Sequence, residues 1–282
     1  MKVRLRLTLC LSSLLTLSGC ASTPTDATAA LRRAPFILLG ELHDNPAHHA
    51  ARAALLTELL ADRKRTTVVF EQLDRDQDGT LKALAPGTSS QALIEAAGFD
   101  QKGWAWPLHK PVFDAALAGG ANVRGGNITR DQARQIVRVG ATAWPVDLAA
   151  LNAATPWSDA QQAALLQDIA QSHCGALPAA MLPGMVQAQR ARDAALAQAM
   201  LNARAAGAER VVLIAGNGHV RRDRAVPVYL IAAGVAPGAI ISRGYLEGDS
   251  ASADDGGGVQ AYDGVVRTAG VARGDVCAGF GQ

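Results

Sequence analysis

Short runs of apolar residues alternate along this chain with longer stretches in which apolar positions recur at helical spacing. Runs of this length without polar interruption are typical of strands that are buried on both faces of a parallel sheet. The predicted strands are residues 36–39, 67–70, 121–124, 210–215, 226–231 and 239–245. The predicted helices are residues 47–60, 91–97, 111–118 and 178–206.

Two further helix starts are indicated by Thr129 and Ser158, because each precedes a glutamine by three residues, as in a capping box. Strands that alternate with helices predict an α/β fold with a mostly parallel central sheet flanked by helices. The largely helical interval 72–206 predicts an inserted helical subdomain within a single domain of residues 35–282.

The first residues have the pattern of a bacterial secretion leader. A cationic start is followed by an apolar run over residues 7–17 and then by Leu17-Ser18-Gly19-Cys20. We expect residues 1–19 to be a signal peptide, Cys20 to be lipidated and residues 20–34 to be a tether. An ordinary signal peptide with an incidental cysteine, or an uncleaved anchor, is the alternative. The residue after the cysteine, Ala21, favours an outer-membrane location facing the periplasm.

Composition and charge narrow the class of protein. The chain has 282 residues, of which 49% are hydrophobic, enough for a globular core. Its formal charge is +2, but Lys2, Arg4 and Arg6 lie in the leader. The rest of the chain has 24 basic and 25 acidic residues, a net charge of −1. No basic surface for nucleic acid is therefore expected, and no internal run is long enough to span a membrane.

Two cysteines, Cys174 and Cys277, remain after Cys10 leaves with the leader and Cys20 takes the lipid. An even pair in an oxidising compartment is expected to form a disulfide. The rival interpretation is that the two thiols are metal ligands. A disulfide would fasten an otherwise weakly held carboxyl-terminal tail.

Polar side chains follow the predicted strands where each strand ends. Glu41 and His43 follow the first strand, Glu71 the second, Asn127 the third, and His219 the strand near residue 213. Because the carboxyl ends of parallel strands meet at one edge of a sheet, we expect these side chains to gather around one crevice.

Two kinds of chemistry suit this set. Imidazole and carboxylate groups bind Zn²⁺, Mn²⁺ or iron, and such an ion activates water for hydrolysis. Alternatively, the same groups form a buried hydrogen-bonded network that only shapes a cavity. His48 and His49 are adjacent in a predicted helix and therefore face different sides, so that at most one faces the crevice.

Several dispersed motifs also occur together. Gly40-Glu41-Leu42-His43-Asp44-Asn45, followed by His48-His49, resembles the opening signature of the ChaN-type haem-binding lipoproteins. The segments that extend the resemblance are 69–72, 104–107, 126–127, 173–178, 185–193, 216–220 and 275–277. The resemblance implies haem as ligand, a role in iron or haem uptake, and a homodimer that encloses paired haems.

The resemblance also implies a tyrosine on the haem iron, but the tyrosines here are Tyr229, Tyr245 and Tyr262, all late in the chain. Another donor is therefore expected, and His109 and His173 lie in the helical middle. The remaining cofactor-binding candidates are His43, His219, Glu41 and Glu71. Met181 and Met185 could face the haem, Trp104, Trp106 and Trp144 could wall its slot, and Lys110, Arg130 and Arg134 could meet its propionates.

The chain also resembles the Tiki/TraB and erythromycin-esterase group, in which glutamate and histidine residues serve metal-dependent hydrolysis. That resemblance implies an alternative function as a metal-dependent hydrolase or protease. Its catalytic and metal-binding residues would be Glu41, His43, Glu71 and His219. A third possibility is a family member whose crevice is only structural.

Overall fold

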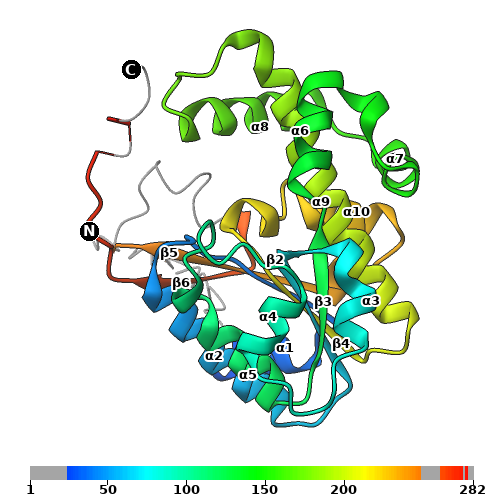
Figure 1. Ribbon diagram of the computed structural model, residues 1–282, viewed down its shortest axis with the longest axis vertical. Coiled ribbons are helices and arrows are strands. Elements are labelled where there is room, and N and C mark those ends of the chain that lie inside the picture. The colour runs from blue at the N-terminus through cyan, green and yellow to red at the C-terminus, as the bar shows by residue number, and fades with distance from the viewer. Residues whose placement is uncertain (1–23, 249–260, 276, 279–282) are drawn as a thin grey trace, which may run out of the picture.

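A six-stranded parallel sheet is the centre of the protein, seen in a computed structural model that describes residues 24–248, 261–275 and 277–278 (Figure 1). The strand order is β3-β2-β4-β1-β5-β6, so the late strand β4 lies between the two earliest strands. The strands are β1 (Phe36–Leu39), β2 (Thr66–Asp74), β3 (Asn122–Asn127), β4 (Arg210–Ile214), β5 (Ile240–Glu247) and β6 (Gly264–Thr268). The predicted α/β class with a parallel sheet is confirmed.

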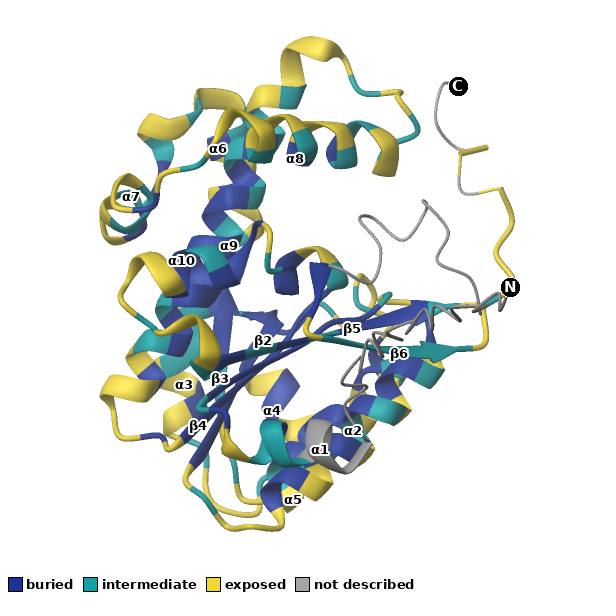
Figure 2. Cartoon of the chain, turned by 180° about the vertical axis from the view of Figure 1, so that it is seen from behind, coloured by how far each residue is buried: buried dark blue, intermediate teal, exposed yellow. Residues whose placement is uncertain are grey.

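Helices cover both faces of the sheet. Side chains alternate between the two faces along each strand, so each face presents apolar side chains to the helices. Ile37 and Leu39 point to one face, where they pack with α1 (Pro24–Arg33), α2 (Pro46–Leu60), α3 (Asp78–Lys82), α4 (Ser90–Ala96) and α5 (Lys110–Ala118). Phe36 and Leu38 point to the other face, where they pack with α6 (Arg130–Val139), α7 (Val146–Ala153), α9 (Leu182–Ala205) and α10 (Val226–Ala232). Figure 2 shows the central strands as fully buried.

Two helical segments, α8 (Asp159–Ser172) and the start of α9, extend away from the sheet, and we name them the projecting helices (Figure 1). The helix α8 packs through Leu165 and Ile169 against Val186 near the start of α9, in a small core of its own. The predicted helical interval 72–206 is thus divided by β3, which joins the sheet, and its helices are shared between both faces (Figure 1).

Local sequence signals explain the helix ends. The Asn45 side chain accepts hydrogen bonds from the backbone N–H groups of Ala47 and His48, which starts α2. Both predicted capping boxes, at Thr129 and Ser158, are present. These caps set the direction in which α2 and α6 leave the ends of their strands.

One predicted element is wrong. Residues 226–231, expected as a strand, form α10, because a short apolar run can be a buried helix and Pro227 suits a first helical turn. The expected tether contains the helix α1, and its Leu31 is 1% exposed against the core. The strand β6 was not predicted.

The predicted disulfide joins Cys174, after α8, to Cys277 in the tail. It links the projecting helices to the chain that leaves β6 at the far edge of the sheet. The predicted leader and the lipidation site Cys20 lie outside the described residues. Within the described part of the chain, none of the helices is long and apolar enough to cross a bilayer.

Candidate functional site

Four side chains from the ends of three strands meet at the carboxyl edge of the sheet. His43 Nδ1 is 2.7 Å from Glu41 Oε1, and His219 Nε2 is 3.2 Å from Glu71 Oε1. Gly216 joins the two pairs: its N–H donates to Glu71 at 2.7 Å, and a Cβ built on it would lie 3.0 Å from His43 Nε2. The predicted convergence is therefore confirmed.

Among these four side chains, His43 is the exposed one. Its side chain is 46% exposed, whereas that of Glu41 is fully buried. Because a carboxylate oxygen only accepts, His43 Nδ1 donates to Glu41, and this leaves the lone pair on Nε2. The Trp104 ring lies edge-on to the His43 ring, with centroids 5.0 Å apart. The site thus presents one oriented imidazole nitrogen to solvent.

Behind His43, Glu41 is held by buried partners. The Arg52 guanidinium, which is completely buried, forms an ion pair with the other oxygen of Glu41. Burial lowers the pKa of Arg52 to about 9, so it is still charged at neutral pH. Gln72 Nε2 donates to Glu41 Oε1 at 3.1 Å, and His49 Nε2 donates to the His43 carbonyl at 2.9 Å. Glu41 is therefore a fixed support for His43.

A group with metal-ligand spacing lies in this buried region. One ligand atom from each of Glu41, His49 and His109 falls within 4.8 Å of the others. The Arg52 guanidinium, however, contacts Glu41 and also donates to His49 Nδ1 at 2.9 Å. A bound cation would have to displace a buried positive charge, so this donor set does not fit a metal ion.

His219 is enclosed by two carboxylates, one on each ring nitrogen. Asp193 Oδ1 is 2.6 Å from Nδ1, opposite the contact of Nε2 with Glu71. Burial opposes the charge on the ring, but the two carboxylates outweigh it and raise the pKa of His219 to about 10. Burial alone would raise the pKa of Glu71, yet the charge and hydrogen bond of His219 hold it well below its ordinary value.

This protonation bears on the predicted metal set of Glu41, His43, Glu71 and His219, which stays a prediction. An imidazolium donates from both nitrogens and has no lone pair for a metal ion. His219 is therefore an internal counter-ion for Glu71 and Asp193, and the fully buried Glu41 is committed to Arg52. Neither is available as a ligand in this arrangement, which leaves His43 as the accessible donor of the predicted set.

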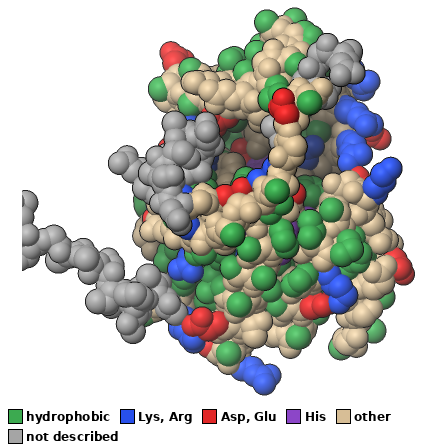
Figure 3. All heavy atoms as spheres, turned by 90° about the vertical axis from the view of Figure 1, so that its left-hand side faces the viewer, with side chains coloured by type: hydrophobic (Ala, Val, Ile, Leu, Met, Phe, Trp, Pro, Cys, Tyr) green, Lys and Arg blue, Asp and Glu red, His purple; other side chains and the backbone are tan. Residues whose placement is uncertain are grey.

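Two cavities flank the Glu71–His219 pair. One, of about 440 Å³, is lined by Glu71, Trp104, Asn127, Arg130 and Arg192 among others. The other, of about 240 Å³, lies under α8 and is lined by residues that include Asp193 and Gly218. Figure 3 shows a hollow on one face of the molecule, between the projecting helices and the body that carries the sheet.

The other predicted haem donors lie away from solvent or away from this edge. His109 is 1% exposed and packs edge-on against His49, and burial lowers its pKa to about 2, so the ring is neutral. His173 ends α8, half-buried, and its Nδ1 donates to the Ile169 carbonyl at 2.8 Å. The three tyrosines of the chain, all late in the sequence, are also buried: Tyr229, Tyr245 and Tyr262.

The predicted accessory residues have mostly structural places. Trp106 and Trp144 are buried in the two cores, and Met185 packs beneath α8, whereas Met181 is 40% exposed. The three basic candidates are paired with surface carboxylates: Lys110 with Asp114, Arg130 with Asp100, and Arg134 with Asp131. Of the tryptophans, Trp104 is the one beside His43.

Three functional residues were not predicted: Arg52, Asp193 and Arg192. Arg52 lies three residues after His49, so both are on one face of α2. An arginine on the apolar face of an Ala- and Leu-rich helix is a sequence signal that could have indicated a buried charge. Asp193 is likewise a charge on a buried face of α9. Arg192 donates to the Asn127 amide oxygen at 2.8 Å and borders the larger cavity.

Comparison with known proteins agrees with this fold. No curated protein matches the sequence. Among solved structures, the chain is similar to ChaN of Campylobacter jejuni, a structure described as cofacial heme binding, with a TM-score of 0.66 and 18% identity over 84% of this chain and 89% of that one. A mutant of the erythromycin esterase EreC gives a TM-score of 0.44 and 13% identity, over 79% of this chain and 72% of that one.

The sequence profile of one family covers most of the chain. It is described as haem-binding uptake, Tiki superfamily, ChaN, and it matches residues 27–230. The matched region contains β1 to β4 and every residue of the site at the carboxyl edge. The chain belongs to the ChaN family of haem-binding uptake proteins.

Proposed function

We propose that this protein binds haem at the carboxyl edge of its sheet and takes part in iron or haem uptake. The observation that carries the proposal is His43, an oriented and half-exposed imidazole in a chain of a haem-binding family. Imidazole is a common ligand of haem iron, and a carboxylate on its second nitrogen strengthens such a ligand. The donor chemistry of this edge therefore fits haem.

The surroundings of His43 supply the other groups that a haem requires. Trp104 offers an aromatic edge beside the donor, and the adjoining cavity of about 440 Å³ is bordered by Arg192 and Arg130. Arg192 has an amide oxygen rather than a carboxylate as its hydrogen-bond partner, which leaves its charge for a propionate. A bound haem would supply iron as the cargo, and His43 would hold it.

His43 takes the place of the tyrosine that the resemblance implies, because the three tyrosines are buried. His173 is the second candidate donor, since it lies on the projecting helices, while His109 is enclosed in the core. The hydrolase alternative is not favoured, since Glu41 and His219 are committed to buried ion pairs.

The test is a titration of the purified full-length protein with hemin, followed by its Soret absorption. We expect a shift that saturates at one haem per chain and that weakens at least tenfold in His43→Ala. Wild-type protein that gives no saturable shift would overturn the function. An unchanged affinity in His43→Ala together with a loss in His173→Ala would move the iron to His173.

A matched pair of glycine variants tests the position of His43 without removing its side chain. A Cβ at Gly216 would lie 3.0 Å from His43 Nε2 and 3.1 Å from Cε1, whereas a Cβ at Gly218 would meet nothing within 4 Å. We expect Gly216→Ala to displace the imidazole and weaken haem binding about tenfold, and Gly218→Ala to leave binding unchanged. Equal affinities in the two variants would contradict the placement.

We further propose that the protein is anchored by lipid at Cys20 in the outer membrane, facing the periplasm, and that haem binding joins two copies. The leader sequence supports the anchor, and the cofacial arrangement named for the Campylobacter jejuni structure supports the dimer. Cys20→Ser should release the protein from the membrane fraction. Light scattering should show twice the monomer mass only after hemin is added.

A further inference from the structure

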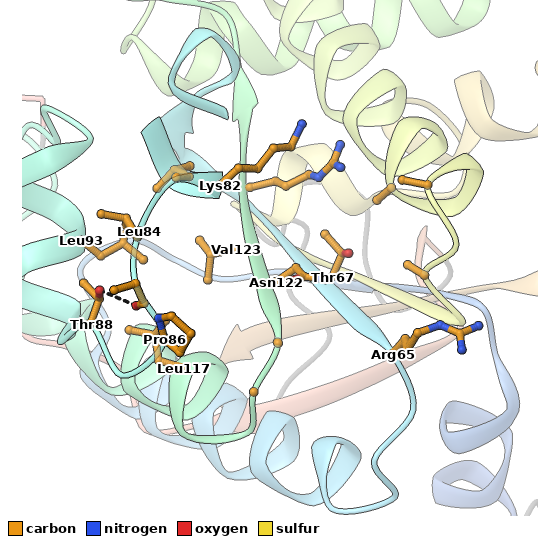
Figure 4. Close-up of a pocket in the computed structure, with 18 of the residues that line it drawn as sticks. Arg65, Thr67, Lys82, Leu84, Pro86, Thr88, Leu93, Leu117, Asn122 and Val123 are labelled. Carbon is orange, nitrogen blue, oxygen red and sulfur yellow. Dashed lines mark hydrogen bonds between the residues drawn. The ribbon is translucent and has the colours of Figure 1, made fainter. Parts of the chain in front are cut away.

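A further cavity lies at the opposite end of the sheet from His43. It has a volume of about 680 Å³ and opens where β2 and β3 begin, beside the end of α9 (Figure 4). Thr67 and Asn122, which pair with each other in the sheet, border it, as does Ala206 after α9. Because parallel strands place their starts and ends at opposite edges, this cavity is separate from the proposed haem site.

The charges around this cavity are unbalanced. Its lining contains three basic residues, Arg65, Lys82 and Arg124, and no acidic residue. The nearest carboxylates lie outside the lining and at the outer limit of an ion pair: Asp78 is 3.6 Å from Arg124, and Glu209 is 3.7 Å from Arg65. Lys82 makes neither an ion pair nor a side-chain hydrogen bond within the described part of the chain.

Two neutral polar side chains at the cavity are also uncommitted. The Thr67 hydroxyl and the Asn122 amide form no side-chain hydrogen bond to any described residue. Thr67 is itself only 3% exposed, so its hydroxyl would remain unpaired unless a ligand or water meets it. These two groups supply hydrogen-bonding capacity close to the basic side chains.

The opposite side of the cavity is apolar. Leu84, Leu93, Leu117 and Pro86 line it, on the face of the sheet to which Val123 points. Thr67 and Asn122 point to the other face, so the edge strand β3 lies between the two sides and a ligand that meets both must pass around it. Figure 4 shows this division, with the leucines and Pro86 on the left and Thr67 and Arg65 on the right, and with Lys82 above. A ligand that fills the cavity must therefore be charged at one end and hydrocarbon at the other.

We propose that this cavity binds an amphipathic organic anion, namely a carboxylate with a linear hydrocarbon chain. The carboxylate would accept hydrogen bonds from Lys82, Asn122 and Thr67, and the chain would cover the leucine side. A sugar phosphate does not suit the apolar side, where its hydroxyl groups would be unpaired, and a neutral lipid leaves the basic residues without a partner. The volume lies within the usual range of small-molecule pockets.

Calorimetric titration of the purified full-length protein with octanoate, 1-octanol and acetate tests the proposal, with the same ligands titrated into buffer and detergent alone as blanks. We expect saturable binding of octanoate, and at least tenfold weaker binding of octanol, which lacks the charge, and of acetate, which lacks the chain. Acetate that binds as tightly as octanoate would overturn the role of the apolar side, and octanol that does so would overturn the role of the charge.

Charge-reversal variants locate the site. Lys82→Glu should weaken octanoate binding at least tenfold, and Lys102→Glu, which reverses an exposed lysine outside the cavity, should not. Asn122→Asp places a carboxylate at the same site through a different residue and should also weaken binding. Wild-type affinity in both Lys82→Glu and Asn122→Asp would refute the proposal. Hemin titration in saturating octanoate should give an unchanged Soret shift. A failure of octanoate binding can therefore be told apart from a failure of haem binding at His43.

Discussion

Replacing His219 by glutamine removes the one positive charge between two buried carboxylates. The side chain of His219 is 7% exposed, and those of Glu71 and Asp193 are 7% and 2% exposed, so water cannot take over its role. The rise of the pKa of His219 from 6.5 to about 10 corresponds to roughly 5 kcal/mol at about 1.4 kcal/mol per pH unit. Removing one partner from a buried ion pair costs about 3–5 kcal/mol, which agrees with this magnitude.

The same shift predicts how stability depends on pH. Because the folded protein holds the His219 proton up to a pKa of about 10, whereas the unfolded chain releases it near 6.5, this contribution is complete below pH 6.5. It is then lost as the pH rises towards 10, by about 1.4 kcal/mol per pH unit. Glu71 acts in the opposite direction, because its lowered pKa stabilises the fold above 4.5 and this contribution is lost on acidification.

Urea unfolding followed by tryptophan fluorescence at pH 6, 7, 8 and 9 measures the size of the His219 contribution and its dependence on pH. We expect His219→Gln to lower the free energy of unfolding by about 3–5 kcal/mol at pH 6, and to have a shallower decline towards pH 9 than the wild type. His48→Gln is the matched control, since burial lowers the pKa of His48 and so disfavours a charge on that ring. A His219→Gln protein with the wild-type pH dependence would refute this reasoning.

Further predictions concern the carboxyl-terminal segment. Arg273→Ala should cost about 1 kcal/mol at pH 7, measured by urea unfolding, because Arg273 pairs with two carboxylates. The difference in unfolding free energy from the wild type should shrink below pH 4.5 and be small at pH 2, because the pKa of Glu247 is lowered to about 2. A difference that stays constant with pH would contradict this ion pair. Cys174→Ser should cost about 2–4 kcal/mol, and wild-type protein unfolded in a reducing thiol should match it. Equal stability with and without the thiol would show that the cross-link contributes nothing.

The position of the site was predictable because it depends on topology more than on side-chain detail. A polar residue directly after a buried parallel strand must lie at the carboxyl edge, whichever helix follows it. Glu41 and His219 satisfy this rule from β1 and β4, which are neighbours in the sheet. Glu71 satisfies it from within β2, which extends to Asp74 and not only to the predicted end at Phe70.

The protonation of the site was not predictable in the same way. Whether an imidazole is a ligand or a counter-ion depends on which groups approach it from other elements. Asp193 reaches His219 from α9, and Arg52 reaches Glu41 from α2. The pattern of either helix can indicate a buried charge, but it does not indicate which partner that charge meets. The metal interpretation of the four residues is not favoured for this reason.

The wrong strand prediction at residues 226–231 and the missed helix α1 have separate physical causes. Six apolar residues at 226–231 fit a buried strand and a buried helix equally well, because neither has a polar face to define a period. The observed helix packs Tyr229 and Leu230 against α9, a partner that is fixed only in three dimensions. The helix α1 was missed because its residues are small and polar, with Leu31 as its buried anchor.

The place of β4 in the sheet has a consequence for how the chain acquires its structure. Phe36 and Thr67 both pair with Val211, so the two earliest strands are joined only by one that is synthesised much later. A nascent chain that ends before residue 210 has two apolar strands with unpaired edges, a state that favours aggregation. Folding that waits for such distant pairing is slow. This protein should therefore need to be kept unfolded until nearly all of it has been made.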